Sequence, residues 1–561
     1  MDGRSTPRTG YSADVLLFLA CVDPDSRPAR DRALDTDETV GTDDTAVGPE
    51  QLGTAPEPPD ESDAVFDTFN VHTIALEMPA ADWADVQYNP GAEAWHTATF
   101  SWDGEVVADV GVRAFGQGSV VAGKPPLKID FDRTIDGQEW RGLEQIKLDS
   151  STQDAGFLNE AVGTAVLRAM DLPAARSGWA NVTVNGAHVG LFVVLESIDD
   201  GFVKRWFGHD DGALYSIGTW RYGQGLNPIT WGTVADWYEP QTSVGGDGSE
   251  IVAAIEVLAS GSDADVRAAI DVDRFTRIAV ARAAIGAIDA FAADGNNFYL
   301  YDDHGVLAPI AWDLDADLGY PYYFDNALSM GLEEPWLWSH ARYNPVTGAV
   351  YSDPVHTRAV AMGWDIDGYL AELLAGPLEW EALDAEVARQ AAVIHDSACA
   401  DTYHSCASFE HRVVDLRFFL HSRLATLAGG EVAECRASRT PTVVSGTALV
   451  DSTRWAPGFM VGGEHHCNGL SVTAPTTVSI RVDAGTLSGA VGVHDQNMNP
   501  CAGDTFSIAQ SGVTLWEGSA AAYAPAVPFA VAVGEGVVEL TAVGAGAGCD
   551  AAVWVDLRVG E

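Results

Sequence analysis

The sequence predicts an α+β body with two lobes, followed by a separate all-β sandwich. Three observations predict this: short alternating apolar runs fill residues 69–133, helical apolar spacing dominates from residue 251 onward, and residues 443–561 contain many short strand-like runs without a convincing helix. The 561 residues allow two or three domains, and a hydrophobic content of 47% is enough for large cores.

The first lobe is predicted to be rich in strands. From "FNVHTIALEM" to "PLKIDFDR", alternating runs are separated by Gly, Asp and Asn, which is typical of strands and turns. Next, "DAGFLNEAVGTAVLRAMDL" has helical spacing, and "PAARSGWANVTVNGAHVGLFVVLESI" indicates two strands around an Asn-Gly turn.

The second lobe is predicted to be mainly helical. Four segments carry apolar residues at helical spacing: "EIVAAIEVLAS", "DVDRFTRIAVARAAIGAIDAFA", "LDAEVARQAAVIHDSA" and "FEHRVVDLRFFLHSRLATLAG". A hairpin interrupts them, and the whole two-lobed body is expected to span residues 66–435.

The hairpin gathers oxygen-bearing side chains. "FYLY" and "VLAPIAW" read as strands joined by the turn "DDHG", which folds Asn296 and Asn297 towards Asp313 and Asp315. Carboxylate and amide oxygens suit Mg²⁺ or Ca²⁺. The alternative is a solvated loop rich in Asp and Asn, but the neighbouring tryptophan and aliphatic residues favour fixed positions.

The charge excludes one class of function. The formal net charge is −50, from 31 Lys and Arg against 81 Asp and Glu. A nucleic-acid-binding protein needs basic surfaces to neutralise phosphates, so we expect no nucleic-acid partner.

Six of the seven cysteines lie late in the chain. They show neither CxxC pairs nor the histidine spacing of zinc sites, which favours three disulfides in an oxidising compartment over buried free thiols. Two expected pairs are Cys399 with Cys406 and Cys501 with Cys549.

The amino-terminal region indicates export. Residues 1–21 end in "VLLFLAC", which resembles a lipoprotein signal segment with Cys21 as the lipid-bearing residue, although its apolar core is short and Asp14 adjoins it. Residues 22–65 are acidic and proline-bearing, as in a disordered linker. We expect an exported cell-surface lipoprotein or extracellular protein, attached to the membrane only through a lipid on Cys21, because no apolar run approaches 18 residues.

Several blocks in register resemble the CotH spore-coat kinase family. They are "PLKIDFDR", the segment from "GLEQIKLDSS" to "VKRWFG", "IDAFAADGNNFYLY" and "IAWDLDADLG", and the resemblance covers about residues 70–430. It implies a two-lobed atypical protein-kinase-like domain that uses ATP with Mg²⁺ or Mn²⁺ and phosphorylates Ser or Thr on surface proteins.

The resemblance also implies roles for individual residues. Asp289 would be the catalytic base that orients the acceptor hydroxyl and takes its proton. Metal binding falls to Asn297, Asp313 and Asp315, and nucleotide binding to Lys128, Glu160, Arg113 and Glu196. In detail, Lys128 would reach the phosphates and pair with Glu160, Arg113 with Gly116 and Gly118 would cover them, and Glu196 would lie near the base.

Each residue has a simpler interpretation. A strand lysine such as Lys128 is usually a solvated edge charge, Glu160 could decorate a helix surface, and Asp289 could cap a helix. Asp294 is a second candidate for the base, being closer to Asn297 in sequence. The chain also departs from many members in having Asn296 in place of a histidine and Ser216 in place of a lysine.

Residues 443–561 resemble carbohydrate-binding modules of the NPCBM type, which are jelly-roll sandwiches. "AVGVHD" and "VTLWEGS" carry the similarity, and Trp516 is expected either to stack on a sugar or to pack in the core. The resemblance implies a surface glycan as a partner.

Three functions compete. The first is an exported kinase, the second a catalytically silent surface adhesin that binds glycan, and the third a glycoside hydrolase with paired carboxylates. The joint presence of the six polar residues at positions 128, 160, 289, 297, 313 and 315 favours the kinase, and the Asp-x-Asp spacing argues against the hydrolase.

Overall fold

The structure is a computed structural model of the chain. It describes residues 60–116, 120–217, 225–227, 233–242, 244–287, 289–318, 342–343, 350–351, 353–428, 442–450, 459–462, 464–466, 468–494, 503–544 and 552–560. The predicted signal segment, most of the predicted linker and the pair Cys501 and Cys549 lie outside these residues. Val65 is fully buried, so the fold takes in the end of the predicted linker.

A closed barrel forms the first lobe, as the β-rich prediction requires, with strand order β1-β2-β3-β4-β5-β7-β6 and a parallel β1–β6 pair that closes it. The strands are β1 (Val71–Glu77), β2 (His96–Trp102), β3 (Glu105–Ala114), β4 (Leu127–Asp130), β5 (Gln145–Asp149), β6 (Ser177–Val184) and β7 (Ala187–Glu196). Short helices flank them: η1 (Glu61–Ala64), α1 (Ala80–Tyr88) and η2 (Pro90–Ala92). The predicted pair of strands around Asn-Gly is β6 and β7.

The barrel is filled by apolar side chains, and alternation places the next residues outside. Val112, Ile129 and Ile146 belong to the interior cluster. Because successive side chains of a strand point to opposite faces, Lys128 and Lys147 project from the outer face. Both of these polar side chains therefore belong to the surface that meets the second lobe.

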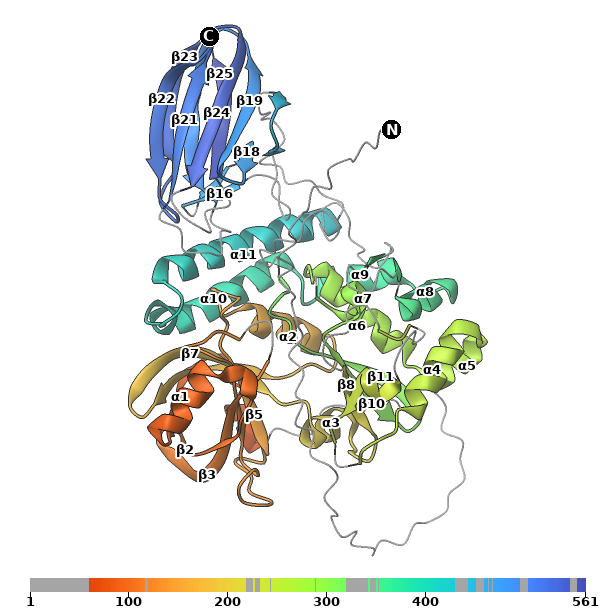
Figure 1. Ribbon diagram of the computed structural model, residues 1–561. Helices are drawn as coiled ribbons and strands as arrows, with labels where there is room; N and C mark the ends of the chain where they lie inside the picture. The colour runs from red at the N-terminus through yellow and green to blue at the C-terminus, as the bar shows by residue number, and fades with distance from the viewer. Residues whose placement is uncertain are drawn as a thin grey trace, which may run out of the picture.

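The second lobe combines a small sheet with helices (Figure 1). Its four-stranded sheet has the order β11-β10-β8-β9, with β8 (Leu214–Ile217), β9 (Tyr238–Pro240), β10 (Phe298–Asp303) and β11 (Val306–Ala311). Smaller elements are η3 (Val234–Asp236), β12 (Arg342–Tyr343) and β13 (Val350–Tyr351). The helices are α2 (Asn159–Ala169), α3 (Asp200–Phe207), α4 (Ser249–Ser260), α5 (Asp263–Ala269), α6 (Val272–Ala284), α7 (Phe291–Asp294), α8 (Pro354–Ala361), α9 (Ile366–Ala375), α10 (Trp380–Cys399) and α11 (Cys406–Leu427).

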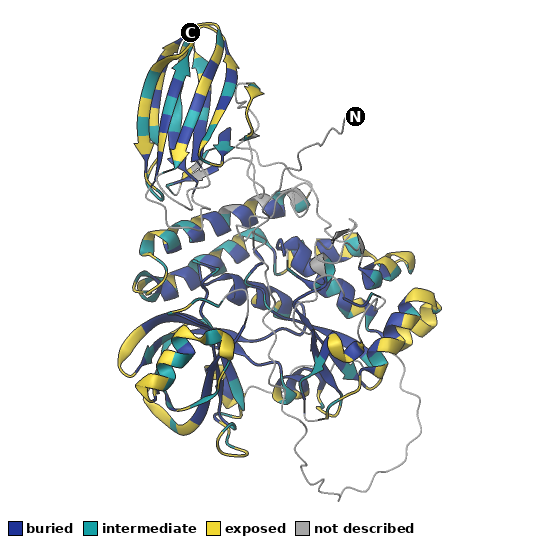
Figure 2. Ribbon diagram, viewed as in Figure 1, coloured by how far each residue is buried: buried dark blue, intermediate teal, exposed yellow. Residues whose placement is uncertain are grey.

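One apolar core joins the lobes. It takes residues from α2, the outer face of β7, α6, the β10–β11 hairpin, α10 and α11. Figure 2 shows the buried residues concentrated in this middle region, whereas α5 and the outer strands of the barrel carry exposed residues. The hairpin and α2 are therefore held in a rigid setting, which matters for the polar side chains at their ends.

A disulfide-closed loop, residues 399–406, connects α10 to α11 and lies on the barrel. Cys399 and Cys406 are bonded, which confirms this predicted pair. Asp401 Oδ2 accepts hydrogen bonds from Lys124 Nζ at 2.7 Å and from Leu191 N at 2.9 Å. Burial opposes ionisation of Asp401, but the charge and hydrogen bond of Lys124 outweigh it and hold the pKa of Asp401 below its ordinary value. We call this loop the strap, because it ties the helical lobe to the barrel.

The sandwich follows as two five-stranded sheets, which confirms an all-β carboxyl-terminal region. The first sheet contains β14 (Val443–Ser445), β19 (Thr476–Val482), β24 (Gly536–Gly544), β21 (Asp504–Gln510) and β22 (Val513–Ala520) in spatial order. The second contains β15 (Leu449–Val450), β18 (Gly469–Val472), β25 (Ala552–Gly560), β20 (Gly485–Val493) and β23 (Val527–Val533), and β16 (Phe459–Val461) pairs with β17 (Glu464–His466). Figure 1 shows the sandwich beyond α11, on the side away from the barrel.

None of the helices in the described part of the chain is both long enough and apolar enough to cross a membrane.

Candidate functional site

The predicted hairpin is present, and its open end carries the predicted polar residues. β10 pairs antiparallel with β11, with Phe298 opposite Ala311, and His304 and Gly305 form a two-residue turn with φ of 53° and 92°. Asn297 and Asp313 flank the paired strands and both have φ of 55°. A left-handed backbone costs free energy in non-glycine residues and persists only where neighbours enforce it.

Arg282 on α6 is the neighbour that enforces this geometry. Its guanidinium forms a two-pronged ion pair with Asp317, at 3.0 Å from Nε and 2.8 Å from Nη2. It also donates to four main-chain carbonyls, those of Asn297, Trp312, Asp289 and Asp313, at 3.0–3.3 Å. Burial opposes the charge on Arg282, but Asp317 outweighs this effect and raises the pKa of the guanidinium. One cation therefore gathers all the segments that carry the site.

Asp289 lies outside a helix, which differs from the apolar helical pattern of the sequence. Helix α6 ends at Ala284, and Gly286 follows with φ of 83°, a conformation that stops the helix. Asp289 does not cap α7, because the residue at that position is Ala290. Its Oδ1 accepts a hydrogen bond from Asn296 Nδ2 at 2.9 Å, and its side chain is partly exposed.

Asn297 is oriented by the same segment. Its Nδ2 donates to the carbonyl of Asp289 at 3.1 Å, while its Oδ1 is buried and has no hydrogen-bond partner among the described residues. A buried amide oxygen without a partner costs free energy, and a bound cation would remove that cost.

Glu160 approaches the site from α2. Its Oε2 accepts from the main-chain N of Leu314 at 2.5 Å, and its Oε1 is buried without a hydrogen-bond partner in the described part of the chain. The ion pair expected between Glu160 and Lys128 is not formed in this structure. Gly163, one turn further along α2, leaves room for Leu314, since a Cβ there would lie 2.8 Å from Leu314 Cδ2. The segment of residues 313–315 thus rests directly on α2.

Negative charge accumulates at this point. Burial raises the pKa of Asp315 well above its ordinary value, and the charges of Asp313 and Asp149 raise it further. Burial, then Asp313 and Asp149, act in the same direction on Glu160. Crowded buried carboxylates of this kind favour a proton or a cation as compensation.

The donor set fits a hard divalent cation held partly by another molecule. Asn297, Asp313 and Asp315 offer only oxygen atoms, which suits Mg²⁺ or Mn²⁺. In the described residues, no three of the carboxylates at this site lie within 4.8 Å of one another. A site with one or two carboxylates, completed by phosphate oxygens and water, is the usual arrangement for Mg²⁺ with a nucleotide.

Basic residues lie in one row across the outer face of the barrel. Arg113 pairs with Lys128, and Lys128 with Lys147, so the three side chains share a face. Lys147 comes nearest to the acidic site, with Nζ 4.1 Å from the ring centroid of Trp312, the residue before Asp313. Sequence reasoning missed Lys147, although "IKLD" repeats the pattern of "LKID" around Lys128.

Arg113 is fully buried and is held by neighbours in the first lobe. It donates to Glu93 and to the carbonyl of Ala114, and its guanidinium lies 5.0 Å from the centroid of the Trp95 ring. Gly116 has φ of 88°, whereas Gly118 lies outside the described residues.

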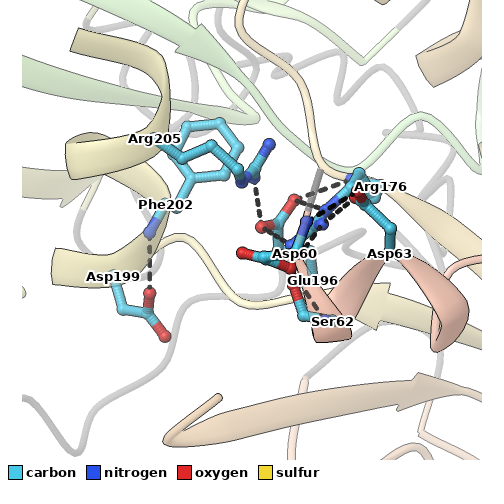
Figure 3. Close-up of polar contacts among 8 residues, drawn as sticks. All are labelled: Asp60, Ser62, Asp63, Arg176, Glu196, Asp199, Phe202 and Arg205. Atoms are coloured by element: carbon cyan, nitrogen blue, oxygen red, sulfur yellow. Dashed lines mark hydrogen bonds and ion pairs between the residues drawn. The ribbon is translucent and has the colours of Figure 1, made fainter. Parts of the chain in front are cut away.

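Glu196 ends β7, where the chain passes to the second lobe, and it is engaged by arginines. Figure 3 shows its carboxylate between Arg176 and Arg205, with Asp63 on Arg176. Arg176 Nη2 lies 2.8 Å from Glu196 Oε1, and Nε lies 3.2 Å from Oε2. The structure thus gives Glu196 a role in joining the lobes, and contact with a nucleotide base stays a prediction.

Other residues singled out in the sequence have clear positions. Ser216 on β8 accepts a hydrogen bond from Gln241 Nε2 at 2.9 Å. The side chain of Asp294 lies outside the described set. In the sandwich, the Trp516 ring packs on that of Phe529, with centroids 5.3 Å apart, and lies over Gly518. This contact accords with the core-packing alternative for Trp516.

Residues that sequence reasoning missed include Asn159 and Arg412, which support the site from behind. Asn159 Nδ2 donates to the carbonyls of Asp315 and Asp317 at 2.6 and 3.0 Å, and its Oδ1 accepts from Arg412 at 3.0 Å. A signal existed for Arg282, because a charged residue within the apolar run "AVARAA" requires a buried partner.

Two family models match the chain. The model described as CotH kinase protein matches residues 112–427, more than half of the chain, and that of the NPCBM/NEW2 domain matches residues 438–560. No curated protein matches.

Solved structures match only the region of the sandwich. The second CBM51 and INT domains of Clostridium perfringens ZmpB, in complex with GlcNAc, are 16% identical with a TM-score of 0.19, covering 21% of this chain and 28% of that chain. The CBM51 of Clostridium perfringens GH95, in complex with methyl-galactose, is 14% identical with a TM-score of 0.19, covering 21% of this chain and 91% of that one. Tandem CBM51 modules of the family 98 glycoside hydrolase from Streptococcus pneumoniae SP3-BS71 are 12% identical with a TM-score of 0.18, covering 22% and 43%. Scores this low support no conclusion about a ligand.

Proposed function

The chain belongs to the CotH kinase protein family, and from this premise we propose that it transfers the γ-phosphate of ATP to Ser or Thr residues of surface proteins. The observation that carries the proposal is the acidic site at the open end of the β10–β11 hairpin, where Asn297 Oδ1 and Glu160 Oε1 are buried without hydrogen-bond partners in the described residues. A binding platform has no chemical need for oxygens held in this way.

The residues divide the chemistry between them. Asp289 is partly exposed and fixed by Asn296, so it can accept the proton of an acceptor hydroxyl. This also explains the Asn296 departure, because an amide can donate the hydrogen bond to the carboxylate. Asn297, Asp313 and Asp315 would hold Mg²⁺ or Mn²⁺, which when bound supplies charge stabilisation on the phosphate oxygens. Two acids are therefore separated by task, one for the proton and the others for the cation.

Positive charge comes from the barrel. The row of Arg113, Lys128 and Lys147 faces the second lobe, and phosphoryl transfer depends mainly on positioning and on charges that stabilise phosphate oxygens. Lys147 is the member of the row that contacts Trp312, next to the acidic site. We include it with Lys128 as a residue that binds the nucleotide phosphates.

The test is transfer of labelled phosphate by the full chain. Parent protein with Mg²⁺ or Mn²⁺ is compared with Asp289→Asn and Asp313→Asn, and a chelator is added to one set of samples. We expect the parent to label itself or an added acidic protein, and we expect both substitutions and the chelator to reduce labelling by at least about a hundredfold.

The matched control is Asp302→Asn. Asp302 lies in the same hairpin but at its turn, where its Oδ1 accepts from Gly305 N at 2.8 Å, so this change should leave transfer intact. A parent protein that transfers no phosphate and gains no thermal stability from ATP with Mg²⁺ would rule out the kinase. Equal loss in Asp302→Asn would assign the effect to the hairpin fold.

A second candidate function concerns the sandwich. Because residues 438–560 match the NPCBM/NEW2 family, we propose that this region binds a surface glycan, in a kinase or in a catalytically silent adhesin. Glycan-array binding by the full chain, with the Asp313→Asn variant as a second sample, tests this. Equal glycan binding by both proteins is expected, and an absence of binding to any glycan by both contradicts the idea.

Location is part of the proposal. The family match and the sandwich accord with an exported protein, and Cys399–Cys406 is a bond typical of oxidising compartments. Lipid attachment at Cys21 is tested by labelling cells with a fatty-acid analogue and comparing the parent with Cys21→Ser.

A further inference from the structure

A cluster of histidines and aspartates lies at the turn of the β10–β11 hairpin, the end remote from the acidic site. Its members are His209 and Asp211, which follow α3, and Asp303 and His304, which form part of the turn. Six residues separate Asn297 from Asp303 along a strand, which corresponds to about 20 Å. This cluster, the hairpin-tip cluster, is therefore distinct from the site proposed for phosphate transfer.

One carboxylate oxygen lies between two imidazole nitrogens. His209 Nε2 is 2.9 Å and His304 Nδ1 is 3.5 Å from the same Oδ1 of Asp303. One ligand atom from each of these three residues lies within 4.8 Å of the others. In a tetrahedral zinc site with bonds of about 2.0–2.1 Å, ligand atoms lie roughly 3.3 Å apart, so the observed separations bracket the required value.

The opposite nitrogens of both rings face a second carboxylate. His209 Nδ1 is 2.6 Å and His304 Nε2 is 3.6 Å from Asp211 Oδ1, and the Tyr301 hydroxyl also lies 3.0 Å from His209 Nδ1. The two rings stack with centroids 3.9 Å apart and planes inclined by 22°. A histidine that binds a metal through one nitrogen normally gives its other nitrogen to a carboxylate, a carbonyl or water. Asp211 supplies that contact for both rings at once.

The surroundings favour a cation. "GHDD" and "DDH" bring four aspartates to the same tip, including Asp210 and Asp302. The charges of Asp211, Asp303 and Asp210, together with burial, raise the pKa of Tyr301, which places these carboxylates around one point. The Asp303 side chain is only 7% exposed, whereas that of His304 is 64% exposed, so the site is anchored on one side and open to solvent on the other.

We propose that the hairpin-tip cluster binds a zinc-type divalent cation, with His209 Nε2, His304 Nδ1 and Asp303 as ligands and Asp211 as the positioning carboxylate. Two imidazoles with one carboxylate suit Zn²⁺ and its first-row neighbours rather than Mg²⁺. The cation ties the segment after α3 to the hairpin that also carries Asn297 and Asp313, so its role is to brace the hairpin. The proposal stands independently of phosphate transfer.

The test is a zinc titration of the full chain after chelator treatment, in excess Mg²⁺ so that the oxygen-rich site is not counted. Parent protein is compared with His304→Gln, a change at an exposed side chain that should not disturb folding. The control is His72→Gln, because His72 also contacts an aspartate, Asp103 at 2.7 Å, but belongs to no such cluster. We expect the parent and His72→Gln to bind one zinc equivalent that His304→Gln binds at least tenfold more weakly.

Two further readouts separate ligation from folding. Asp211→Asn should weaken zinc binding by about 10–100-fold, as is usual when a partner of a metal-binding histidine is changed. Electron paramagnetic resonance of the Cu²⁺-loaded protein should show two coordinating imidazoles in the parent and one in His304→Gln. Equal zinc affinity in the parent and His304→Gln, or a spectrum with fewer than two nitrogens in the parent, overturns the proposal. Loss of the equivalent in His395→Gln instead would place the zinc at the strap and overturn it equally.

Discussion

Replacement of Arg282 by methionine gives the sharpest test of how the acidic site is held. The side chain is 2% exposed and its partner Asp317 is 0% exposed. Removal of one member of a buried ion pair usually costs about 3–5 kcal/mol, because the other charge stays buried without compensation. The four carbonyls that accept hydrogen bonds from Arg282 lose their donor too, each at about 1 kcal/mol where no water replaces it.

We therefore expect Arg282→Met to lower the free energy of unfolding of the body by about 4–6 kcal/mol. Because the sandwich can unfold separately, the measurement should be hydrogen exchange resolved to residues 289–318, supported by urea unfolding. The control is Arg417→Met. Arg417 makes the same two-pronged contact with Asp384, at 2.6 and 2.7 Å, but is 42% exposed, so its loss should cost at most about 1 kcal/mol.

The double change Arg282→Met with Asp317→Leu separates the two contributions. It leaves no buried unpaired charge, so part of the loss should be recovered, while the carbonyls still lack their donor. Equal costs for Arg282→Met and Arg417→Met would refute the view that Arg282 organises the site. So would full recovery of both stability and Mn²⁺ binding in the double variant.

Three more perturbations have defined outcomes. The pKa of Asp401 lies below its model value of 3.8, so ionised Asp401 stabilises the fold above about pH 4 and this contribution disappears as pH falls further; urea titrations from about pH 5 to 3 should show a flatter profile for Asp401→Asn. Replacing Cys399 and Cys406 by alanine opens a loop with a sequence separation of 7 and should cost about 2–3 kcal/mol in thermal or urea unfolding, against no change on adding a reductant to the variant. Gly163→Ala places a methyl group against Leu314 and should weaken Mn²⁺ binding more than it lowers stability, because helix propensity offsets part of the about 1–3 kcal/mol of crowding; unaltered Mn²⁺ affinity would contradict this contact.

Local chemistry made the hairpin predictable. "DDHG" between two apolar runs allows few alternatives, and the observed turn at His304 and Gly305 follows from it. The end of α6 was not predictable from spacing, because apolar residues keep helical spacing beyond Ala284 while Gly286 leaves the helix. Periodicity reports which face is apolar, and it does not report where the backbone turns.

The supporting contacts could not be predicted for a different reason. Arg282 and Asp317 are 35 residues apart, and Asn159 reaches the carbonyl of Asp315 from 156 residues away. Such partners depend on how α2 and α6 pack, which no local pattern specifies. The same limit applies to Lys147, whose sequence context equals that of Lys128 and whose position beside Trp312 appears only in the folded chain.

The strap has a mechanical consequence. The lobes are joined by the chain at Glu196 and again by residues 399–406, through contacts such as His404 Nε2 with the carbonyl of Ser151 at 2.8 Å. A body fastened to another at two separate places keeps one easy motion, rotation about the line through the fastenings. Sliding of the lobes past each other would break one of the two joints, so the pair should swing like a door on two hinges, and cutting the disulfide should add a twisting motion that the intact protein lacks.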